Sequence, residues 1–363
     1  MSKKSTILVT ATKTGGHLLP AVSVGKAISR LQPDIKVHIA TSGAEIETTV
    51  LQGSNLPVHV IRSGGLKGTG HFMRLANLGQ LPLALVASLR LLKKLRPAVV
   101  AGFGGFTTGP VMLAAYLMGI PTAILEANSI PGLTNKLSGK FVNRVFISFK
   151  TTLNYFPKRK TELTGTPVRQ QITFIKKGKQ TGPARHILVF GGSQGAQFLN
   201  ETMPKILAKT ARQIQGLTVL HQTGKNGVNA TMQAYKEAGV DATVSEYMPD
   251  MASTYKWADF VVARSGAGTI AELIETGLPS LLVPFPLAAD DHQYYNALEL
   301  KKREAAMLVR QEECDIEYLS KELTQLLTSA DKLNRMAEAV RAIKTGNAAE
   351  IIAQKLLKMA GYK

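Results

Sequence analysis

Hydrophobic residues occur along this chain in short, nearly continuous runs, and longer amphipathic stretches separate the runs. Short apolar runs that alternate with helical patterns are typical of parallel sheets covered by helices on both faces. The pattern therefore predicts the α/β class. The strands expected are 7–10, 36–41, 59–62, 98–101, 122–126 and 144–148 in the first half and 186–190, 218–222, 242–246, 260–263, 280–283 and 306–308 in the second, and the helices expected in the first half are 20–31, 44–52, 72–95, 108–118 and 135–139.

The length of 363 residues suits about two domains. A polar stretch at 167–184, rich in Lys, Gln, Gly and Thr, is expected to link a first domain at 1–166 to a second domain at 185–344. The amphipathic segment 345–363 is expected to form a helix that packs back on the first domain.

Cysteine content and apolar run lengths indicate the compartment. The single cysteine, Cys314, excludes an intrachain disulfide and fits a reducing cytosol. The apolar run after the basic start is too short for a signal peptide, and no stretch reaches the roughly eighteen apolar residues of a membrane span. Ligand residues do not cluster at metal-site spacings. We expect a soluble or peripheral protein with no intrinsic metal.

Two Gly-rich loops follow predicted strands, one in each half of the chain. Thr14, Gly15, Gly16 and His17 follow the first strand, and 191–195, with Ser193 at its centre, follows strand 186–190. Such loops let backbone N–H groups approach a phosphate, and the helix N-terminus behind them favours negative charge. Neither loop matches GxGxxG or ends in GK[ST], which lowers the weight of dinucleotide and Walker A interpretations.

Two titratable residues in the first half are candidates for catalysis. His17 has the pKa range of a general base near neutral pH, although a helix-capping or phosphate-binding role fits its position equally. Glu126 ends strand 122–126, at the sheet edge where open α/β sheets carry their functional groups, and Asn128 follows it. A third Gly-rich segment, 102–110, allows a close approach of a ligand or of another backbone.

The segment 259–297 carries the strongest nucleotide signal. Strand 260–263 runs into small residues and a helix expected to begin near Thr269, whose amides suit a diphosphate. Glu272, one turn into that helix, can accept both hydroxyls of a ribose, whereas the alternative is an acid that merely favours the helix dipole. The loop after strand 280–283 holds adjacent Asp290, Asp291 and His292, but neighbouring side chains in an extended loop point apart, which disfavours a metal.

Positive charge is concentrated in the first half of the chain. The net charge is +19, and residues 1–170 hold 21 Lys and Arg against 5 Asp and Glu. Basic residues flank the apolar segment 64–97, which suits an anionic membrane surface. For residues 85–92 a buried crossover helix is the favoured interpretation, whereas the membrane interpretation is favoured for residues 71–83. Few interleaved aromatic residues disfavour nucleic acid. Pro82 is expected to interrupt this helix, and the membrane contacts expected are Lys67, Phe72, Arg74 and Leu75.

Seven motifs occur in the order seen in one glycosyltransferase family. They are TGGHLLPA, GFGGFTTGP, LEANSIPGLTNK, LTGTPVR, FGGSQGA, ARSGAGTIAE and PFPLAADDHQYYNA, and the resemblance covers residues 6 to about 300. The chain resembles the MurG family. The resemblance implies a GT-B fold, in which two Rossmann-like parallel-sheet domains are separated by a cleft.

The activity implied by the resemblance is inverting transfer of GlcNAc from UDP-GlcNAc to the C4 hydroxyl of MurNAc in lipid I, which yields lipid II and UDP without a cofactor. The enzyme would be peripheral, on the cytoplasmic face of the cell membrane, with UDP-GlcNAc, lipid I and an anionic membrane as partners and no nucleic acid. A diacylglycerol glycosyltransferase, a UDP-GlcNAc 2-epimerase and a non-catalytic nucleotide- or nucleic-acid-binding protein remain alternatives. The donor-binding residues implied by matching motifs are Thr14, Gly15, Gly16, Asn128, Arg169, Ser193, Met248, Ala267, Gly268, Thr269, Glu272 and Gln293, with His17 and Glu126 as catalytic candidates.

The chain departs from the family pattern at two places. Leu125 and Ala127 stand where the family commonly has His and Gln, so any function of those side chains is missing here. Lys13 adds a positive charge just before the first Gly-rich loop and is expected to alter affinity for the diphosphate.

Overall fold

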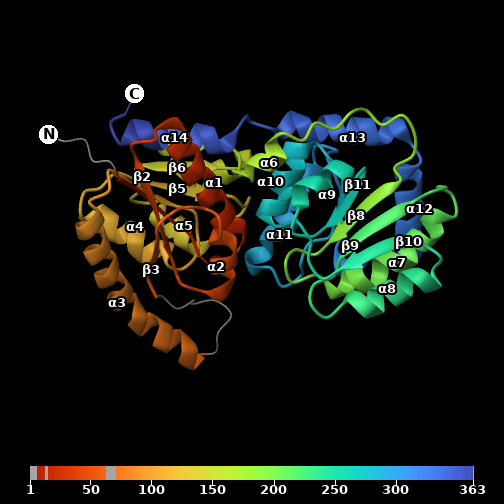
Figure 1. Ribbon diagram of the computed structural model, residues 1–363, viewed down its shortest axis with the longest axis horizontal. Helices are drawn as coiled ribbons and strands as arrows, with labels where there is room; N and C mark the ends of the chain where they lie inside the picture. The colour runs from red at the N-terminus through yellow and green to blue at the C-terminus, as the bar shows by residue number, and fades with distance from the viewer. Residues whose placement is uncertain (1–5, 13–14, 63–70, 363) are drawn as a thin grey trace. The chain divides into compact units, whose positions relative to one another are not determined.

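The computed structural model describes residues 6–12, 15–62 and 71–362 (Figure 1). It divides into two compact units. Unit 1 comprises residues 1–169 together with 345–363, and unit 2 comprises residues 170–344.

Unit 1 is built on a parallel sheet. Within the described residues its strand order is β3-β2-β1-β4-β5-β6-β7, and each neighbouring pair is parallel. The order reverses between β1 and β4, and open α/β sheets bind their ligands beyond the carboxyl ends of the strands at such a reversal. The strands are β1 (Thr6–Thr10), β2 (Lys36–Thr41), β3 (Val58–Val60), β4 (Val99–Gly102), β5 (Thr122–Glu126), β6 (Arg144–Ile147) and β7 (Thr161–Leu163).

Helices cover this sheet, and one of them comes from the far end of the chain. Ile352 and Leu356 of α14 are fully buried against Ile7 and Val9 of β1, and α14 lies alongside α1 (Figure 1). Apolar residues spaced four apart therefore place the C-terminal helix in the core of unit 1. The helical elements are α1 (Gly15–Leu31), α2 (Glu45–Leu51), α3 (His71–Leu95), α4 (Thr108–Leu117), α5 (Leu133–Ser138), η1 (Lys150–Tyr155), η2 (Lys158–Lys160) and α14 (Ala348–Met359).

Unit 2 repeats the scheme. The strand order, taken over the described part of the chain, is β10-β9-β8-β11-β12-β13, again with parallel pairs. Here the order reverses between β8 and β11. The strands are β8 (His186–Phe190), β9 (Thr218–Gln222), β10 (Asp241–Ser245), β11 (Phe260–Ala263), β12 (Ser280–Leu282) and β13 (Met307–Leu308).

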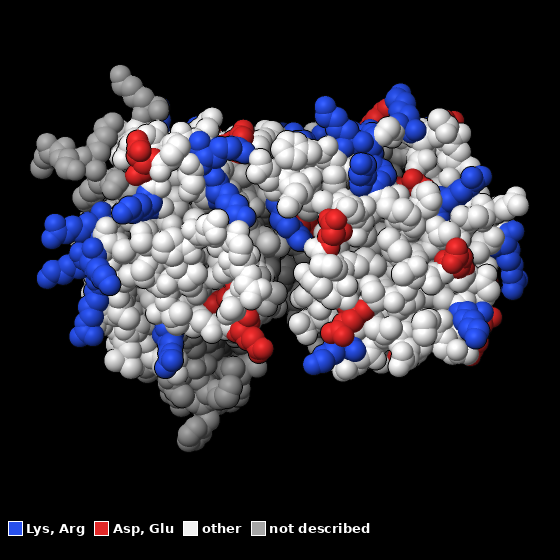
Figure 2. Space-filling view, viewed as in Figure 1, with Lys and Arg blue, Asp and Glu red and all other residues white. Residues whose placement is uncertain are grey.

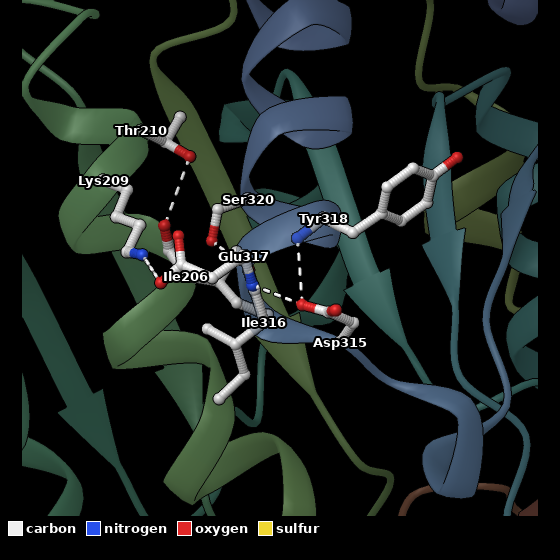
Figure 3. A network of polar contacts seen from close by, with 8 residues as sticks. All are labelled: Ile206, Lys209, Thr210, Asp315, Ile316, Glu317, Tyr318 and Ser320. Carbon is white, nitrogen blue, oxygen red and sulfur yellow. Dashed lines mark hydrogen bonds and ion pairs between the residues drawn. The ribbon is translucent and has the colours of Figure 1, made fainter.

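Side-chain capping fixes where helix α12 of unit 2 begins. The Asp315 carboxylate accepts the N–H groups of Glu317 and Tyr318 at 2.8 and 3.1 Å, which starts α12, and Lys209 of α7 pairs with Glu317 (Figure 3). The helices are α6 (Gln170–Thr173), α7 (Gln197–Ala211), α8 (Val228–Glu237), α9 (Met251–Trp257), α10 (Ala267–Thr276), α11 (His292–Lys301), α12 (Ile316–Leu327) and α13 (Ala330–Ile343), with 3-10 turns η3 (Ala289–Asp291) and η4 (Gln311–Glu313).

Strand β7 and helix α3 both differ from the sequence-based expectations. Strand β7 was not predicted, because its three residues contain no apolar run and form a strand only by pairing with β6. The expected interruption at Pro82 was wrong, because α3 continues through it. Proline removes a single intrahelical hydrogen bond, and packing of α3 on α4 holds the helix on the C-terminal side.

Candidate functional site

His17 lies in the first turn of α1, directly after the carboxyl end of β1. Its Nδ1 atom is 3.3 Å from the carbonyl oxygen of Thr12. A carbonyl oxygen can only accept, so Nδ1 of His17 is the donor in this contact. The helix begins at Gly15, earlier than the expected residue 20, so Gly15 and Gly16 belong to its N-terminus. Thr14 lies outside the described residues.

The loop after β4 lies against the His17 ring. Gly104 has φ +102°, and a Cβ atom there would be 2.8 Å from Cδ2 and 2.9 Å from Nε2 of His17. Gly105 has φ +91°, and its Cβ would be 2.0 Å from the hydroxyl oxygen of Thr12. Both positions therefore require glycine, and the expected close approach of the 102–110 segment is an approach to His17 and Thr12.

Glu126 is buried and its carboxylate is surrounded by hydrogen-bond donors. Oε1 accepts from the backbone and side-chain nitrogens of Asn128 at 2.9 and 3.2 Å. Oε2 accepts from Gly132 N at 3.1 Å and from Asn135 Nδ2 at 2.9 Å. Burial raises the pKa of the carboxyl group above its usual value, and the four hydrogen bonds offset only part of this rise. The carboxylate thus organises the 126–135 loop and orients Asn128.

In unit 2, the Gly-rich loop after β8 is fastened to the end of β9. Gly195 has φ +74°, and its missing Cβ would be 1.8 Å from the Thr223 carbonyl oxygen. Gln222, at the carboxyl end of β9, donates from Nε2 to the Gly192 carbonyl oxygen at 2.9 Å. Ser193 is exposed at the tip of the loop. These contacts fix the conformation of the Gly-rich loop.

The same Gln222 side chain also holds Met248. Its Oε1 accepts the Met248 N–H at 3.1 Å, and both residues are buried. Because this hydrogen bond uses the Met248 N–H, the backbone group of Met248 that can hydrogen-bond to a nucleobase is its carbonyl oxygen. One carboxamide connects the Gly-rich loop with the expected base-binding position.

Helix α10 begins beside this loop, because β11 pairs directly with β8. The helix starts at Ala267, two residues before the expected start, so Ala267, Gly268 and Thr269 all lie in its first turn and are half-buried. Amides in a first helical turn have no intrahelical acceptor and attract anions. The adjacent strand ends of β8 and β11 thus bring the two predicted phosphate-binding elements together.

Glu272 lies in the second turn of α10 and is 8% exposed. One of its oxygens, Oε2, accepts the hydroxyl of Tyr255 in α9 at 2.9 Å. Glu272 thus lies about one turn after the α10 residues that are predicted to receive the diphosphate.

The loop after β12 is held in place by Arg264, the residue that directly follows β11. Its guanidinium donates to the carbonyl oxygens of Val283 and Pro284 at 3.2 and 2.8 Å and to Gln311 Oε1 at 2.9 Å. Gln293 Oε1 accepts the Phe285 N–H at 3.0 Å, so the Gln293 amide is directed by the same loop.

Sequence reasoning missed the roles of several residues described above, namely Gln222, Tyr255 and Arg264 in unit 2 and Asn135 in unit 1. Gln222 and Arg264 carried a usable signal, since each is a polar residue at the carboxyl end of a strand. Tyr255 and Asn135 sit inside helices and had none. Arg169 is half-buried at the last position of unit 1.

The described side chains form no metal site. Within the ranges 6–12, 15–62 and 71–362, no three His, Cys, Asp or Glu residues lie close enough to hold an ion. In the segment 290–292, the Arg310 guanidinium forms an ion pair with the Asp291 carboxylate, with Nη2 and Oδ2 2.6 Å apart. Asp290 and Asp291 have positive φ values of 54° and 51°.

Helix α3 carries both a packing face and an exposed apolar face. Ala84, Ser88 and Leu92 are buried at a spacing of four residues, whereas Leu83 is 70% exposed. Lys and Arg gather on the side of unit 1 where α3 lies (Figure 2). Of the expected contacts, Lys67 lies outside the described residues, and Phe72, Arg74 and Leu75 lie in the first turns of α3. Of the helices in the described part of the chain, none combines the length and apolar character needed to cross a bilayer.

Comparison with known proteins identifies close relatives. The glycosyltransferase family 28 N-terminal domain matches residues 7–147, and the family 28 C-terminal domain matches residues 186–355. The chain is 37% identical over 348 residues to the UDP-N-acetylglucosamine–N-acetylmuramyl-(pentapeptide) pyrophosphoryl-undecaprenol N-acetylglucosamine transferase of Myxococcus xanthus, covering 96% of this chain and 91% of that protein. It is 38% identical over 360 residues to the protein of the same name from Stutzerimonas stutzeri, covering 98% of each.

Comparison with solved structures supports the same family. MurG of Acinetobacter baumannii matches with a TM-score of 0.80 and 31% identity, covering 97% of this chain and 99% of that chain. UDP-GlcNAc 2-epimerase of Neisseria meningitidis matches with a TM-score of 0.67 at 15% identity, covering 97% of this chain and all of that chain, which shows a shared fold alone. The predicted α/β GT-B fold class and the resemblance to the MurG family are confirmed.

Proposed function

Because the chain belongs to glycosyltransferase family 28, we propose that it transfers GlcNAc from UDP-GlcNAc to lipid I, forming lipid II and UDP. The observation that carries this proposal is near full-length similarity, at 36–38% identity, to transferases whose names state this donor and acceptor. The acceptor is the C4 hydroxyl of MurNAc, and the anomeric configuration is inverted.

The donor binds to unit 2. The first-turn amides of α10, at Ala267, Gly268 and Thr269, receive the diphosphate, because they combine unpaired donors with the positive end of the helix dipole. Ser193 and Arg169 add diphosphate contacts. Glu272 accepts the ribose hydroxyls, the Met248 carbonyl accepts from the uracil, and the Gln293 amide meets the sugar.

Unit 1 supplies the acceptor side, and His17 is the general base. With its proton on Nδ1, its Nε2 lone pair takes the proton of the MurNAc C4 hydroxyl. That oxygen forms a bond to C1 of GlcNAc as the bond from C1 to the diphosphate oxygen breaks. The electron pair leaves with UDP, and the α10 N-terminus stabilises the charge that develops there. No metal or other cofactor takes part.

Glu126 positions Asn128 rather than acting as a base. Its carboxylate is buried and already accepts four hydrogen bonds from its own loop. Asn128 then presents its side chain to the donor sugar, while Thr14, Gly15 and Gly16 face the diphosphates.

The enzyme binds peripherally to the cytoplasmic face of the membrane through α3 and the segment before it. Support comes from the charge excess in residues 1–170 and from exposed Leu83 and Val86 on α3. On the neighbouring helix α4, Tyr116 and Leu117 are also exposed. Apolar side chains beside cations suit an anionic lipid surface, where lipid I is held by its polyprenyl chain.

A direct assay tests the proposed reaction. The protein is incubated with radiolabelled UDP-GlcNAc and a lipid I analogue, and the label is followed into the lipid fraction. We expect label in lipid only when both substrates are present, with UDP released in equal amount. Conversion of UDP-GlcNAc to its 2-epimer without acceptor would contradict the proposal, as would the absence of labelled lipid with a correctly folded protein.

A further inference from the structure

A chain of hydrogen bonds runs through the interior of unit 2 behind the Gly-rich loop 191–195. The Tyr235 hydroxyl of α8 lies 3.0 Å from His221 Nδ1 on β9, and His221 Nε2 lies 3.1 Å from Asn200 Oδ1 on α7. Asn200 Nδ2 donates in turn to the Thr223 carbonyl oxygen at 3.1 Å. Tyr235, His221 and Thr223 are buried, so little solvent competes for these bonds.

The chemistry of the last acceptor fixes the direction of the whole chain. A carbonyl oxygen only accepts, so the Asn200 amide turns its NH₂ group to Thr223 and its oxygen to His221. His221 Nε2 is then the donor to that oxygen. Burial lowers the pKa of His221 to about 3, so the imidazole is neutral near pH 7 and its Nδ1 accepts the Tyr235 hydroxyl proton. Tyr235 thereby favours the one tautomer of His221 that can donate to Asn200.

The Thr223 carbonyl is where this chain meets the Gly-rich loop. A Cβ atom on Gly195 would lie 1.8 Å from the Thr223 oxygen, and one on Gly224 would lie 2.2 Å from the Gln194 carbonyl oxygen. The two backbone segments are therefore packed directly on each other. Because Asn200 fixes the direction of the Thr223 carbonyl, it also limits where the loop can lie.

We propose that Tyr235, His221 and Asn200 are positioning residues that hold the Gly-rich loop in its diphosphate-binding conformation. The inference rests on the proposed function, in which this loop contacts the diphosphate of UDP-GlcNAc through Ser193. A loop that is already held in its bound conformation loses little conformational entropy when the ligand arrives. The three side chains raise affinity for the diphosphate by acting through the Thr223 carbonyl.

Nuclear magnetic resonance of the imidazole nitrogens tests the direction of the chain without any ligand. The protein is labelled with ¹⁵N-histidine and measured at pH 7, and the His221 signals are identified by their absence in His221→Gln. We expect the His221 proton on Nε2. A proton on Nδ1 would overturn the proposal whatever the loop binds.

Calorimetric titration with UDP and with uridine tests the effect on the loop. The two ligands differ only in the diphosphate, so the positioning role predicts a loss of affinity confined to UDP. Asn200→Leu breaks the link to Thr223, and Tyr235→Phe removes only the remote hydroxyl. We expect UDP affinity to fall about five- to tenfold in Asn200→Leu and about three- to fivefold in Tyr235→Phe, and uridine affinity to change less than about twofold, since each variant loses one buried hydrogen bond or its support.

The matched control is Thr210→Val in the last turn of α7, the helix that carries Asn200 in its first turn. Thr210 is also buried, and its hydroxyl lies 3.0 Å from that of Thr324. This variant removes a buried hydrogen bond of unit 2 at the opposite end of the helix from the loop. We expect wild-type affinity for both ligands; a loss confined to UDP in this variant too would contradict a role specific to the chain behind the loop.

Ser193→Asp separates the inference from its premise. It adds a negative charge at the exposed tip of the loop, so it should weaken UDP binding by more than about tenfold and leave uridine binding unchanged. Unchanged UDP binding would mean that the loop does not contact the diphosphate, and the proposed contact itself fails. If Ser193→Asp weakens only UDP, but Asn200→Leu and Tyr235→Phe weaken both ligands equally or neither, the positioning role is overturned.

Discussion

Replacing Glu126 with Gln separates a positioning carboxylate from a catalytic base. The substitution keeps the shape of the side chain but puts an NH₂ group where one carboxylate oxygen accepted two N–H donors. Those donors are the two nitrogens of Asn128 on Oε1, or Gly132 N and Asn135 Nδ2 on Oε2. In either orientation of the new side-chain amide, its NH₂ group faces two N–H donors and has no acceptor there.

The contacts set the size of the effect. Two hydrogen bonds to a charged acceptor are worth roughly 1.5–3 kcal/mol each, and removing a buried charge offsets part of this loss. We expect Glu126→Gln to lower the free energy of unfolding by about 2–4 kcal/mol. For a unit of this size, each kcal/mol lowers Tm by about 2–4 °C, so thermal denaturation followed by circular dichroism will resolve the change.

The control is Glu162→Gln in the same unit. Glu162 pairs with Lys355 at 2.9 Å on the surface, and both side chains are partly exposed. Such pairs contribute about 0–1 kcal/mol. A wild-type Tm for Glu126→Gln, together with a loss of kcat of about 10² or more, would refute the positioning role and make Glu126 the base.

Three further predictions concern catalysis, the membrane and pH. His17→Ala should lower kcat by about 10²–10⁴ and leave the Kd for UDP unchanged; near-normal kcat would exclude His17 as the base. Reversing Lys67 and Arg74 to Glu should weaken binding to anionic vesicles by at least about 2 kcal/mol, at about 1 kcal/mol per cation, and raise KM for lipid I; equal binding of wild type and variant to anionic and neutral vesicles would reject this surface. Burial lowers the pKa of His221 from 6.5 to about 3. Below pH 6.5 the His221 imidazole is therefore protonated in the unfolded chain but stays neutral in the folded chain. The free energy of unfolding should then fall by about 1.4 kcal/mol for each pH unit as the pH is lowered from 6.5 toward the folded pKa. Urea denaturation of wild type and His221→Gln at pH 5, 6 and 7 should show that the free energy of unfolding of the variant depends less steeply on pH; an equal slope for the two proteins would contradict this prediction.

Local pattern was sufficient for most of the fold. Strands β5, β8, β9 and β11 have the bounds that their apolar runs predicted. A strand buried on both faces of a parallel sheet must be apolar at successive positions, so the apolar run in its sequence predicts it. Strand β7 lies at the sheet edge, where that requirement is absent, and only its pairing with β6 reveals it.

By itself, the sequence determined two parallel α/β folding units, the Gly-rich loops at their strand ends, and the polar residues beside those loops, because each depends on neighbours along the chain. Only the tertiary structure decided which of these groups touch. Tyr255 reaches Glu272 from another helix, Gln222 joins Gly192 to Met248, and the Gly104 backbone closes on His17. Residues distant in sequence meet through the packing of strands and helices, which local periodicity leaves open, and those contacts set the orientation and the proton position on which the chemistry depends.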